Sequence, residues 1–229
     1  MKKILFLPMR SGSKSIIHKN IQLISGKPLF KWFIDEALES NIDEIHVAID
    51  TVFYEYFIRG YFPKNTEKLN IYYRDKENSE DSSTTESVII EFLSKNNYNK
   101  NDLFILGQIT NPFIKSEDIN NIIDMYNNTD YNSILSVSCL NGRFIWGDDG
   151  PLNYDYKNRP LRQNDKNNNL YMENGALYIS TVGKIIEYQN RLCPSVGLYK
   201  MDYHTHYELD DEYDLEIIES LLKMKRRKG

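Results

Sequence analysis

Residues 4–14 read ILFLPMRSGSK, a short apolar run that ends in a loop of small, polar and basic residues. A buried strand of a parallel sheet has this continuous apolar character, and the polar loop marks its carboxyl end. Residues 28–40 begin with a proline and carry apolar side chains at helical spacing, and residues 44–50 (EIHVAID) again have the character of a strand. These segments predict a βαβ unit with two parallel strands and a right-handed crossover.

The same alternation continues along the chain. Because no repeat period accompanies it, the pattern predicts an α/β fold: a single domain whose mainly parallel, twisted sheet carries helices on both faces. Residues 141–175 are polar, rich in Asn, Gly and Pro, and without periodicity, so we expect a protruding excursion or lid there. Further strands are predicted at residues 69–74, 103–106, 133–140 and 176–180, and further helices at residues 84–93, 116–126 and 211–225.

Composition narrows the classes of partner. The 229 residues include 33 acids and 28 bases, a net charge of −5, so no basic excess predicts a nucleic-acid partner. The apolar run near the N-terminus is too short for a signal peptide or a membrane span, so we expect a cytoplasmic protein without a membrane partner. Cys139 and Cys193 form no CxxC pair and are interpreted as free thiols.

The loop after the first predicted strand concentrates positive charge. Arg10, Lys14 and Lys19 lie beside Gly12 and several serines, at the sheet edge where ligands of α/β folds bind. Backbone N–H groups with Lys and Arg side chains supply the hydrogen bonds that a triphosphate needs. The loop matches neither GxxxxGK[ST] nor GxGxxG, and on spacing alone a solvated basic turn is an equal alternative.

Near the other end, residues 204–210 read HTHYELD. In an extended strand alternate residues face one side, so this reading predicts that His204, His206, Glu208 and Asp210 point together. Two carboxylates on one face suit Mg²⁺, with water and phosphate oxygens completing the octahedron. The alternatives are that the acids cap the final helix, and that the histidines are solvated or bind a softer metal.

Several of these segments resemble the acylneuraminate cytidylyltransferases, the family that makes CMP-sialic acids. The opening is similar to the pattern PARxGSKGxxxKN followed by GKPL, although Ser15 replaces a glycine. If position 15 requires a positive φ, a serine there is strained. Further resemblances, in the family's order, are Arg74 with Asp81 and Ser82-Ser-Thr-Thr85, Gln108-Ile-Thr-Asn-Pro112 for QPTSP, Glu173-Asn-Gly-Ala176-Leu-Tyr178 for ENGAIY, and Glu208-Leu-Asp210 before Asp214-Leu for DIDxxxDL.

The resemblance implies roles for individual residues. Catalytic positions are Arg10, Lys14 and Lys19, which would hold the triphosphate. The nucleotide would also contact Ser13, Asn20, Arg74 and Thr85. The sugar would meet Gln108, Tyr178 and Arg162, the last at its carboxylate, with Arg159 as the alternative. Glu208 and Asp210 would bind Mg²⁺, and the Glu in place of an Asp leaves Mn²⁺ as an option.

The implied reaction joins CMP, taken from CTP, to the anomeric hydroxyl of an acidic sugar. The acceptor would be a nine-carbon 2-keto-3-deoxy acid of the sialic, legionaminic or pseudaminic type, and pyrophosphate would leave. Residues 141–175 would help to form a homodimer. Two alternatives remain: a cytidylyltransferase for Kdo or a phosphonate, and a non-catalytic nucleotide-sugar-binding protein. The departures from the family's pattern at Ser15, at Ile17 and His18, and at Asn111 bear on phosphate geometry and sugar identity.

Overall fold

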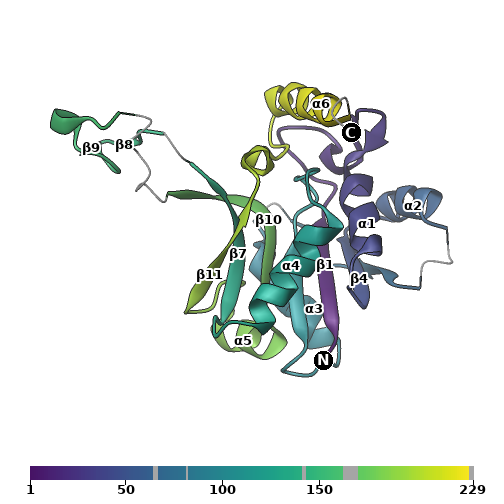
Figure 1. The fold of residues 1–229 in the computed structure, drawn as a ribbon. Coiled ribbons are helices and arrows are strands. Elements are labelled where there is room, and N and C mark those ends of the chain that lie inside the picture. Colours follow the sequence, from purple (N-terminus) through teal and green to yellow (C-terminus); the bar gives the residue numbers. More distant parts are fainter. Residues whose placement is uncertain (64–66, 81, 141–142, 162–169, 227–229) are drawn as a thin grey trace.

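A computed structural model describes residues 1–63, 67–80, 82–140, 143–161 and 170–226 (Figure 1). Residues 225 and 226, at the end of the last range, are described by their backbone alone. The helices are α1 (Leu29–Glu39), α2 (Val52–Tyr61), α3 (Thr85–Lys95), α4 (Ser116–Asn127), α5 (Val182–Tyr188) and α6 (Glu212–Arg226). The strands are β1 (Lys3–Met9), β2 (Leu23–Ile24), β3 (Lys27–Pro28), β4 (Glu44–Ile49), β5 (Leu69–Tyr73), β6 (Leu103–Gly107), β7 (Ser133–Cys139), β8 (Trp146–Gly147), β9 (Gly150–Pro151), β10 (Tyr171–Thr181) and β11 (Val196–Met201). No described helix is both long enough and apolar enough to span a bilayer.

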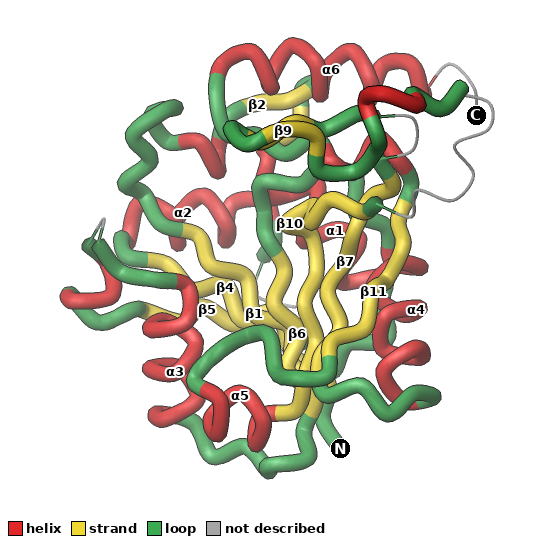
Figure 2. The backbone as a smooth tube through the Cα atoms, turned by 90° about the vertical axis from the view of Figure 1, so that its left-hand side faces the viewer, coloured by secondary structure: helices red, strands yellow, loops and turns green. Residues whose placement is uncertain are grey.

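Seven strands form one twisted sheet in the order β11-β7-β10-β6-β1-β4-β5 (Figure 2). Strand β1 is parallel to both β4 and β6, β4 is parallel to β5, and β11 is parallel to β7. Among the described strands of this seven-stranded sheet, β10 alone is antiparallel to its neighbours, β6 and β7. The predicted α/β class with a mainly parallel sheet is therefore confirmed, and so is the parallel pair in the first fifty residues.

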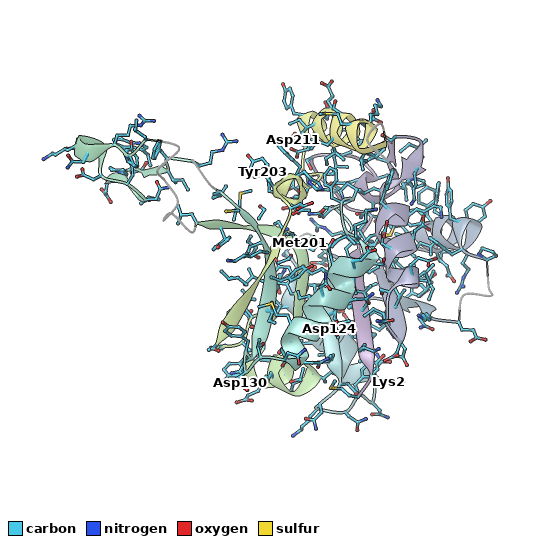
Figure 3. The ribbon with its side chains drawn as sticks, in the orientation of Figure 1. Lys2, Asp124, Asp130, Met201, Tyr203 and Asp211 are labelled. Carbon is cyan, nitrogen blue, oxygen red and sulfur yellow. The ribbon has the colours of Figure 1, made fainter. Side chains whose placement is uncertain are left out.

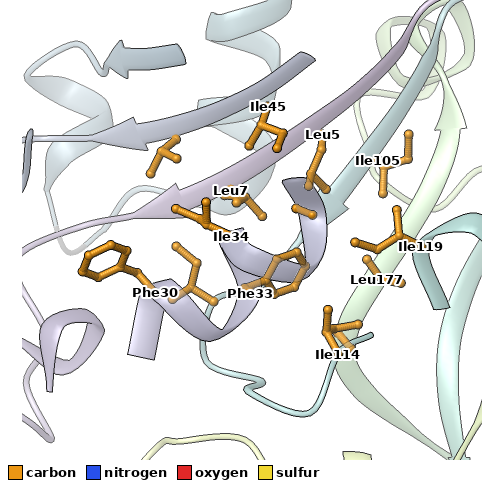
Figure 4. Packing of buried hydrophobic residues seen from close by; sticks show 14 of the residues in the cluster. Leu5, Leu7, Phe30, Phe33, Ile34, Ile45, Ile105, Ile114, Ile119 and Leu177 are labelled. Carbon is orange, nitrogen blue, oxygen red and sulfur yellow. The ribbon is translucent and has the colours of Figure 1, made fainter. Parts of the chain in front are cut away.

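Alternate residues of β1 enter different sides of the core. Leu5 and Leu7 pack with residues of α1, α2, α4 and α6, whereas Ile4 and Phe6 pack with residues of α3 and α5. Figure 4 shows the first of these clusters, with Phe33 of α1 beneath the sheet. Strands with both faces covered have the continuous apolar sequence seen here, which is why this run identified a buried strand.

The end of β6 lies unusually close to α1. A Cβ atom on Gly107 would lie 2.4 Å from Cζ of Phe33 and 2.7 Å from Cδ2 of Leu7. Only glycine tolerates that approach, and it fixes where the chain leaves the sheet and enters the loop beginning with Gln108.

Helices α2 and α5 and the edge strand β11 were not predicted, and neither were the two-residue strands β2, β3, β8 and β9. In Figure 1 the β8–β9 hairpin projects away from the body; it lies within residues 141–175, the segment predicted to protrude. Strand β10 already begins at Tyr171, so the excursion ends earlier than the predicted residue 175.

The two ends of the sheet differ in chemistry. Figure 3 labels Lys2 at one end of the molecule and Asp211 at the other, beyond the carboxyl ends of the parallel strands. At the Lys2 end, His46 Nε2 lies 3.2 Å from Glu44 Oε2, and the Tyr98 hydroxyl donates to Glu44 at 3.1 Å. Burial lowers the pKa of His46, against the opposing effect of Glu44. This cluster lies away from the loops predicted to bind ligand.

Candidate functional site

A cavity of about 540 Å³ lies where β1, β5 and β6 end, bounded by the loops that follow them. Ligands of open α/β sheets bind at this position, beyond the carboxyl ends of the strands and beside the point where the strand order reverses. Here the reversal lies between β1 and β6, since β4 and β5 follow β1 on its other side. Its described lining includes four cationic and two anionic side chains. They are Arg10, Lys14, Lys19 and Arg74, with Glu208 and Asp210; Ser13, Ser15, Asn20, Ser83, Thr84, Thr85, Gln108 and Thr110 add polar groups.

The basic loop after β1 is held from both sides. The backbone N–H of Ser11 donates to both carboxylate oxygens of Asp50, at 3.0 and 2.9 Å, and its hydroxyl donates to one of them at 2.9 Å. Asn20 is buried, and its Nδ2 donates to the carbonyl of Arg10 at 2.9 Å. These bonds bend the loop over the carboxyl end of β1 and bring its cations to the cavity.

The left-handed residue of this loop is His18, with φ of 53°, and not Ser15. Its ring lies against Phe53 and Tyr54 of α2, with centroids 5.3 and 6.2 Å away. The strain that a serine at position 15 would suffer at positive φ therefore does not arise. Ser15 lines the cavity without special backbone geometry.

Arg74 follows β5 and is partly satisfied by the sheet. Its Nε donates to the carbonyl of Ala48 at 3.0 Å, while its buried Nη2 has no hydrogen-bond partner among the described residues. Burial lowers the pKa of Arg74 to about 10, with Asp50 acting against this and Arg10 adding to it. A buried N–H group without a partner is costly, so this side chain favours an oxygen-bearing ligand in the cavity.

The N-terminus of α3 also faces the cavity. Thr84 caps the helix, since its hydroxyl oxygen accepts the N–H of Ser87 at 3.0 Å, and Thr85 begins the first turn. Both threonines line the cavity, and Thr85 is one of the residues predicted to contact the nucleotide. Asp81, in the preceding segment, lies outside the described residues.

Glu208 and Asp210, the acid pair, line the same cavity, but the backbone that carries them is not the predicted strand. Residues Tyr203–His206 form a 3₁₀ helix, so the extended strand predicted for residues 204–210 is wrong. Glu208 accepts a hydrogen bond from the Thr110 hydroxyl at 3.1 Å, and Asp210 Oδ1 lies 2.9 Å from Lys19 Nζ. The chain thus brings the basic loop and the acid pair to one place, although 191 residues separate Lys19 from Asp210.

The donor set fits a hard divalent cation. Burial raises the pKa of Glu208, and the nearby charge of Asp210 raises it further, while Thr110 and Lys19 act in the opposite direction. A cation between two mutually repelling carboxylates relieves that repulsion, and oxygen donors are the ligands Mg²⁺ prefers. Within the described ranges no cluster of three or more His, Cys, Asp or Glu side chains suits a metal, so water or phosphate oxygens would complete the shell.

The predicted histidines do not join this pair. His204 stacks edge-on against Phe113, with ring centroids 5.2 Å apart, and His206 Nδ1 hydrogen-bonds to the carbonyl of Tyr203. Neither histidine lines the cavity. The ring and backbone contacts of the 3₁₀ helix therefore account for both.

A second cavity, of about 510 Å³, shares Gln108 and Glu208 with the first. Tyr178 of β10 lines it, because Tyr178 pairs with Leu106 and so stands beside the end of β6. The structure thus brings the two predicted sugar-side residues, Gln108 and Tyr178, to one cavity that adjoins the cation-rich one. Its lining also includes Glu86, Glu173, Gly175, Asn190, Arg191 and Leu192.

Sequence reasoning missed three charged residues of the second cavity. Arg191 donates through Nε to Glu86 Oε1 at 2.5 Å and through Nη2 to Glu86 Oε2 at 3.1 Å. Glu173 accepts a hydrogen bond from the Tyr178 hydroxyl. Glu86 directly follows the predicted Thr85 in α3, and Glu173 opens the ENGA motif, so both had a local signal. Arg191 stands in a turn with no motif and had none.

The structure bears on only one of the two arginines considered for the sugar carboxylate. Arg162 lies outside the described residues. Arg159 belongs to the protruding segment, where its guanidinium carbon is 4.4 Å from the ring centroid of Phe144 and 5.7 Å from that of Tyr154. These aromatic contacts account for Arg159 within that segment, and it lines neither cavity.

Two residues of the resembling motifs prove to be structural supports. Gly175 has φ of +62°, and a Cβ atom there would lie 2.8 Å from Glu208 Oε2. Asn111 is fully buried; its Nδ2 donates to the carbonyls of Asn174 and Thr205 at 3.1 and 2.7 Å, and its Oδ1 accepts the N–H of Phe113 at 3.2 Å. Asn111 therefore ties three segments together and does not line either cavity.

The thiols agree with the prediction. Cys139 and Cys193 are both free, and Cys193 is buried, with burial raising the pKa of its thiol.

The chain is similar to known proteins both in sequence and in fold. A sequence model of the family described as "Cytidylyltransferase" matches residues 4–214. The N-acylneuraminate cytidylyltransferase of Streptococcus agalactiae serotype III (strain NEM316) is 29% identical over 224 residues, which cover 93% of this chain and 52% of that protein. The CMP-N,N'-diacetyllegionaminic acid synthase of Legionella pneumophila is 26% identical over 243 residues, covering 99% of this chain and 98% of that protein.

The chain thus spans about half the length of the Streptococcus relative and nearly all of the Legionella one. Among solved structures, CMP:2-keto-3-deoxy-manno-octonic acid synthetase complexed with CTP superposes with a TM-score of 0.71 at 15% identity, covering 98% of this chain and 100% of that one. At this identity the likeness concerns the fold.

Proposed function

Because the chain belongs to the cytidylyltransferase family, we propose that it transfers CMP from CTP to a nine-carbon 2-keto-3-deoxy sugar acid and releases pyrophosphate. The observation that carries the proposal is the 2.9 Å contact between Lys19 and Asp210 in a cavity with three further cations. It joins the parts of the chain suited to phosphate and to a metal ion. The names of the two relatives support an acceptor of the sialic or legionaminic type.

The nucleotide occupies the first cavity in this proposal. Arg10 and Lys14 offset the charge that develops on the leaving pyrophosphate, and Lys19 acts at the α-phosphate. Ser13 and Asn20 shape the basic loop, while Arg74 and Thr85 hold the cytidine. Catalysis of this kind consists chiefly of positioning and charge neutralisation, which suits a site rich in fixed cations.

Glu208 and Asp210 would hold Mg²⁺, or Mn²⁺ if the longer Glu side chain alters the geometry. The ion would supply positive charge at the phosphate oxygens during substitution. Lys19, which pairs with Asp210, would stand beside an ion held there and would contribute its charge to the same phosphate.

The acceptor occupies the second cavity, with Gln108 and Tyr178 on its wall. Its anomeric oxygen forms a bond to the α-phosphorus, the bond from that phosphorus to the pyrophosphate oxygen breaks, and the hydroxyl proton passes to solvent. The shared residues Gln108 and Glu208 support this arrangement, because they stand where the two substrates would meet. Arg162 remains our proposal for the sugar carboxylate.

A cytoplasmic homodimer is the proposed assembly. The projecting segment carries exposed apolar side chains, with Trp146, Leu152 and Tyr156 exposed by 58%, 71% and 58%. Single apolar residues on a surface need no explanation, but a group of them on a protrusion suits a protein interface. Light scattering of the wild type against a Trp146→Ser, Leu152→Ser variant tests this, and a monomeric wild type would reject it.

The decisive experiment for the activity is a pyrophosphate-release screen. Purified protein is incubated with Mg²⁺ and CTP and with sialic, legionaminic, pseudaminic or eight-carbon Kdo acids or a phosphonate, with UTP and ATP as nucleotide controls. We expect release with CTP and a nine-carbon acid, and its loss when EDTA is added. Release with Kdo or the phosphonate alone would replace the proposed acceptor. Calorimetric binding of CTP without turnover of any acid would indicate a non-catalytic binding protein.

A further inference from the structure

Arg191 is the cationic side chain of the second cavity. The described lining of that cavity otherwise carries three carboxylates, those of Glu86, Glu173 and Glu208. Because the cavity shares Glu208 and Gln108 with the first, an acceptor whose reacting hydroxyl lies beside Glu208 extends into it. The inference below rests on the proposed function, which supplies that acceptor.

Arg191 is fixed in two directions. The fork formed by its Nε and Nη2 donates to both oxygens of Glu86, and its guanidinium carbon lies 5.1 Å from the ring centroid of Tyr178. The side chains of Arg191 and Glu86 are only 20% and 25% exposed. A guanidinium has five N–H groups, and two of them bind Glu86. Among the described residues, none accepts a hydrogen bond from the other three.

The charge around these N–H groups selects what they bind. Glu86 offsets the charge of Arg191, and Glu173 and Glu208 leave the lining with an excess of negative charge. A carboxylate of the acceptor is disfavoured in these surroundings, because like charges placed together cost several kcal/mol. A neutral oxygen, in a hydroxyl or an acyl carbonyl, pays no such penalty and still accepts a strong hydrogen bond from a guanidinium.

The chemistry of the acceptor agrees with a second cavity that takes neutral oxygens and not the carboxylate. In a 2-keto sugar acid the carboxylate is bonded to the anomeric carbon, so it lies next to the reacting hydroxyl and close to the cation-rich cavity. The hydroxyl and acylamino groups lie farther along the molecule. We propose that Arg191 is a specificity-determining residue that donates hydrogen bonds to a neutral oxygen of the acceptor, and that Glu86 is the positioning residue that holds it.

The test compares Arg191→Met, Arg191→Lys and Glu86→Gln with the wild type. Arg191→Met should raise KM for the acceptor about tenfold, the value of one charge-assisted hydrogen bond, and leave KM for CTP within about twofold. Arg191→Lys keeps the charge but loses the planar fork, so it should behave like Arg191→Met. The control is Arg59→Met, which breaks a similar Arg–Glu pair with Glu55 on α2 and should change neither KM.

Glu86→Gln separates a neutral oxygen from a carboxylate by the sign of its effect. If Arg191 binds a neutral oxygen, Glu86→Gln weakens the two hydrogen bonds that hold the guanidinium in place, and KM for the acceptor rises. If Arg191 binds the acceptor's carboxylate, removal of a competing negative charge lowers KM, and our inference is wrong. An unchanged KM in Arg191→Met would also overturn it.

Two further measurements complete the test. A nine-carbon acid with a hydroxyl in place of the acylamino group shows which neutral oxygen is bound, since the effect of Arg191→Met shrinks only if an acyl carbonyl is the partner. Calorimetric titration of the wild type and Arg191→Met with the same acid decides the inference without turnover. A wild type that binds an acid but releases no pyrophosphate would sink the proposed activity alone, and equal affinity in the variant would sink the role of Arg191 alone.

Discussion

The contact between Lys19 and Asp210 predicts that stability and activity respond very differently to its removal. Lys19 Nζ lies 2.9 Å from Asp210 Oδ1, but the Asp210 side chain is 66% exposed while that of Lys19 is 14% exposed. Solvent around Asp210 screens the pair, so its contribution to the free energy of unfolding is at most about 1 kcal/mol. In a chain of 229 residues that corresponds to a fall in Tm of about 2–4 °C.

The expected loss of activity is larger. Lys19→Met removes a cation from the α-phosphate in the proposed mechanism, and Asp210→Asn removes one of two metal-binding carboxylates. Loss of one charge-assisted interaction costs about 1.5–3 kcal/mol, and each 1.4 kcal/mol is a factor of ten in rate. We therefore expect kcat for pyrophosphate release to fall at least tenfold in each variant. Because both side chains act on the same phosphate, the double variant should lose less than the product of the single losses.

Lys223→Met provides the matched control. Lys223 pairs with Glu219 at the same distance, 2.9 Å, on the surface of α6. Its removal should cost a similar small amount of stability and leave kcat unchanged. Near-normal turnover in either Lys19→Met or Asp210→Asn would remove that residue from the mechanism. A fall in Tm of ten degrees or more would instead attribute the lost activity to unfolding.

Three further predictions concern Gly175, Arg74 and His46. Gly175→Ala places a side chain in the left-handed region, at a cost of about 1–2 kcal/mol, and displaces Glu208, so both Tm and kcat should fall. Gly26→Ala is the control: Gly26 has φ of +81° but nothing within 4 Å of an added Cβ atom, so this change should lower Tm alone. Arg74→Met should raise KM for CTP about tenfold in steady-state assays, and an unchanged KM would place the cytidine elsewhere. Burial lowers the pKa of His46 below 6.5, so the unfolded chain binds more protons than the folded one around that pH. The free energy of unfolding, measured by urea titration, should therefore decrease as the pH falls from about 7.5 to 5.5, and it should decrease less steeply in His46→Gln. Parallel pH profiles for the two proteins would refute this.

The sequence pattern predicted the helices that bury one apolar face and the strands that are buried along most of their length. Helix α2 was missed because its sequence, VFYEYFIRGY, is aromatic on several sides and leaves Val52 and Tyr56 exposed. Strand β11 was missed because it is an edge strand interrupted by Gly197. The antiparallel direction of β10 had no signal, since a strand's pattern reports which faces are buried and not which way the chain runs.

The candidate site was predicted to the extent that loops follow strands. Arg10, Arg74 and Gln108 lie at the ends of β1, β5 and β6, and parallel strands present those ends at one edge of the sheet. Glu208 was placed at the cavity for the wrong reason, because its segment is irregular. Arg191 comes from a turn after α5, and only the tertiary packing of that turn against Glu86 reveals it.

Asn111 explains how an irregular segment delivers the acid pair. A serine, as in the resembling family, has one short O–H donor, whereas the amide of Asn111 reaches the carbonyls of both Asn174 and Thr205 and accepts from Phe113. The chain just before Glu208 is thereby attached to the loop after β6. A buried amide that satisfies three backbone groups is costly to replace, because each unsatisfied group costs about 1–3 kcal/mol.

The neighbouring residue completes the attachment. The N–H of Leu209 donates to the carbonyl of Thr110 at 2.9 Å, and the Thr110 hydroxyl donates to Glu208. Glu208 and Asp210 flank Leu209, which is fully buried, so both carboxylates are held on the cavity side of one anchored residue. The two acids therefore reach the same cavity without a strand, and Asn111 bears on how the acid pair is held, not on how the phosphate is contacted.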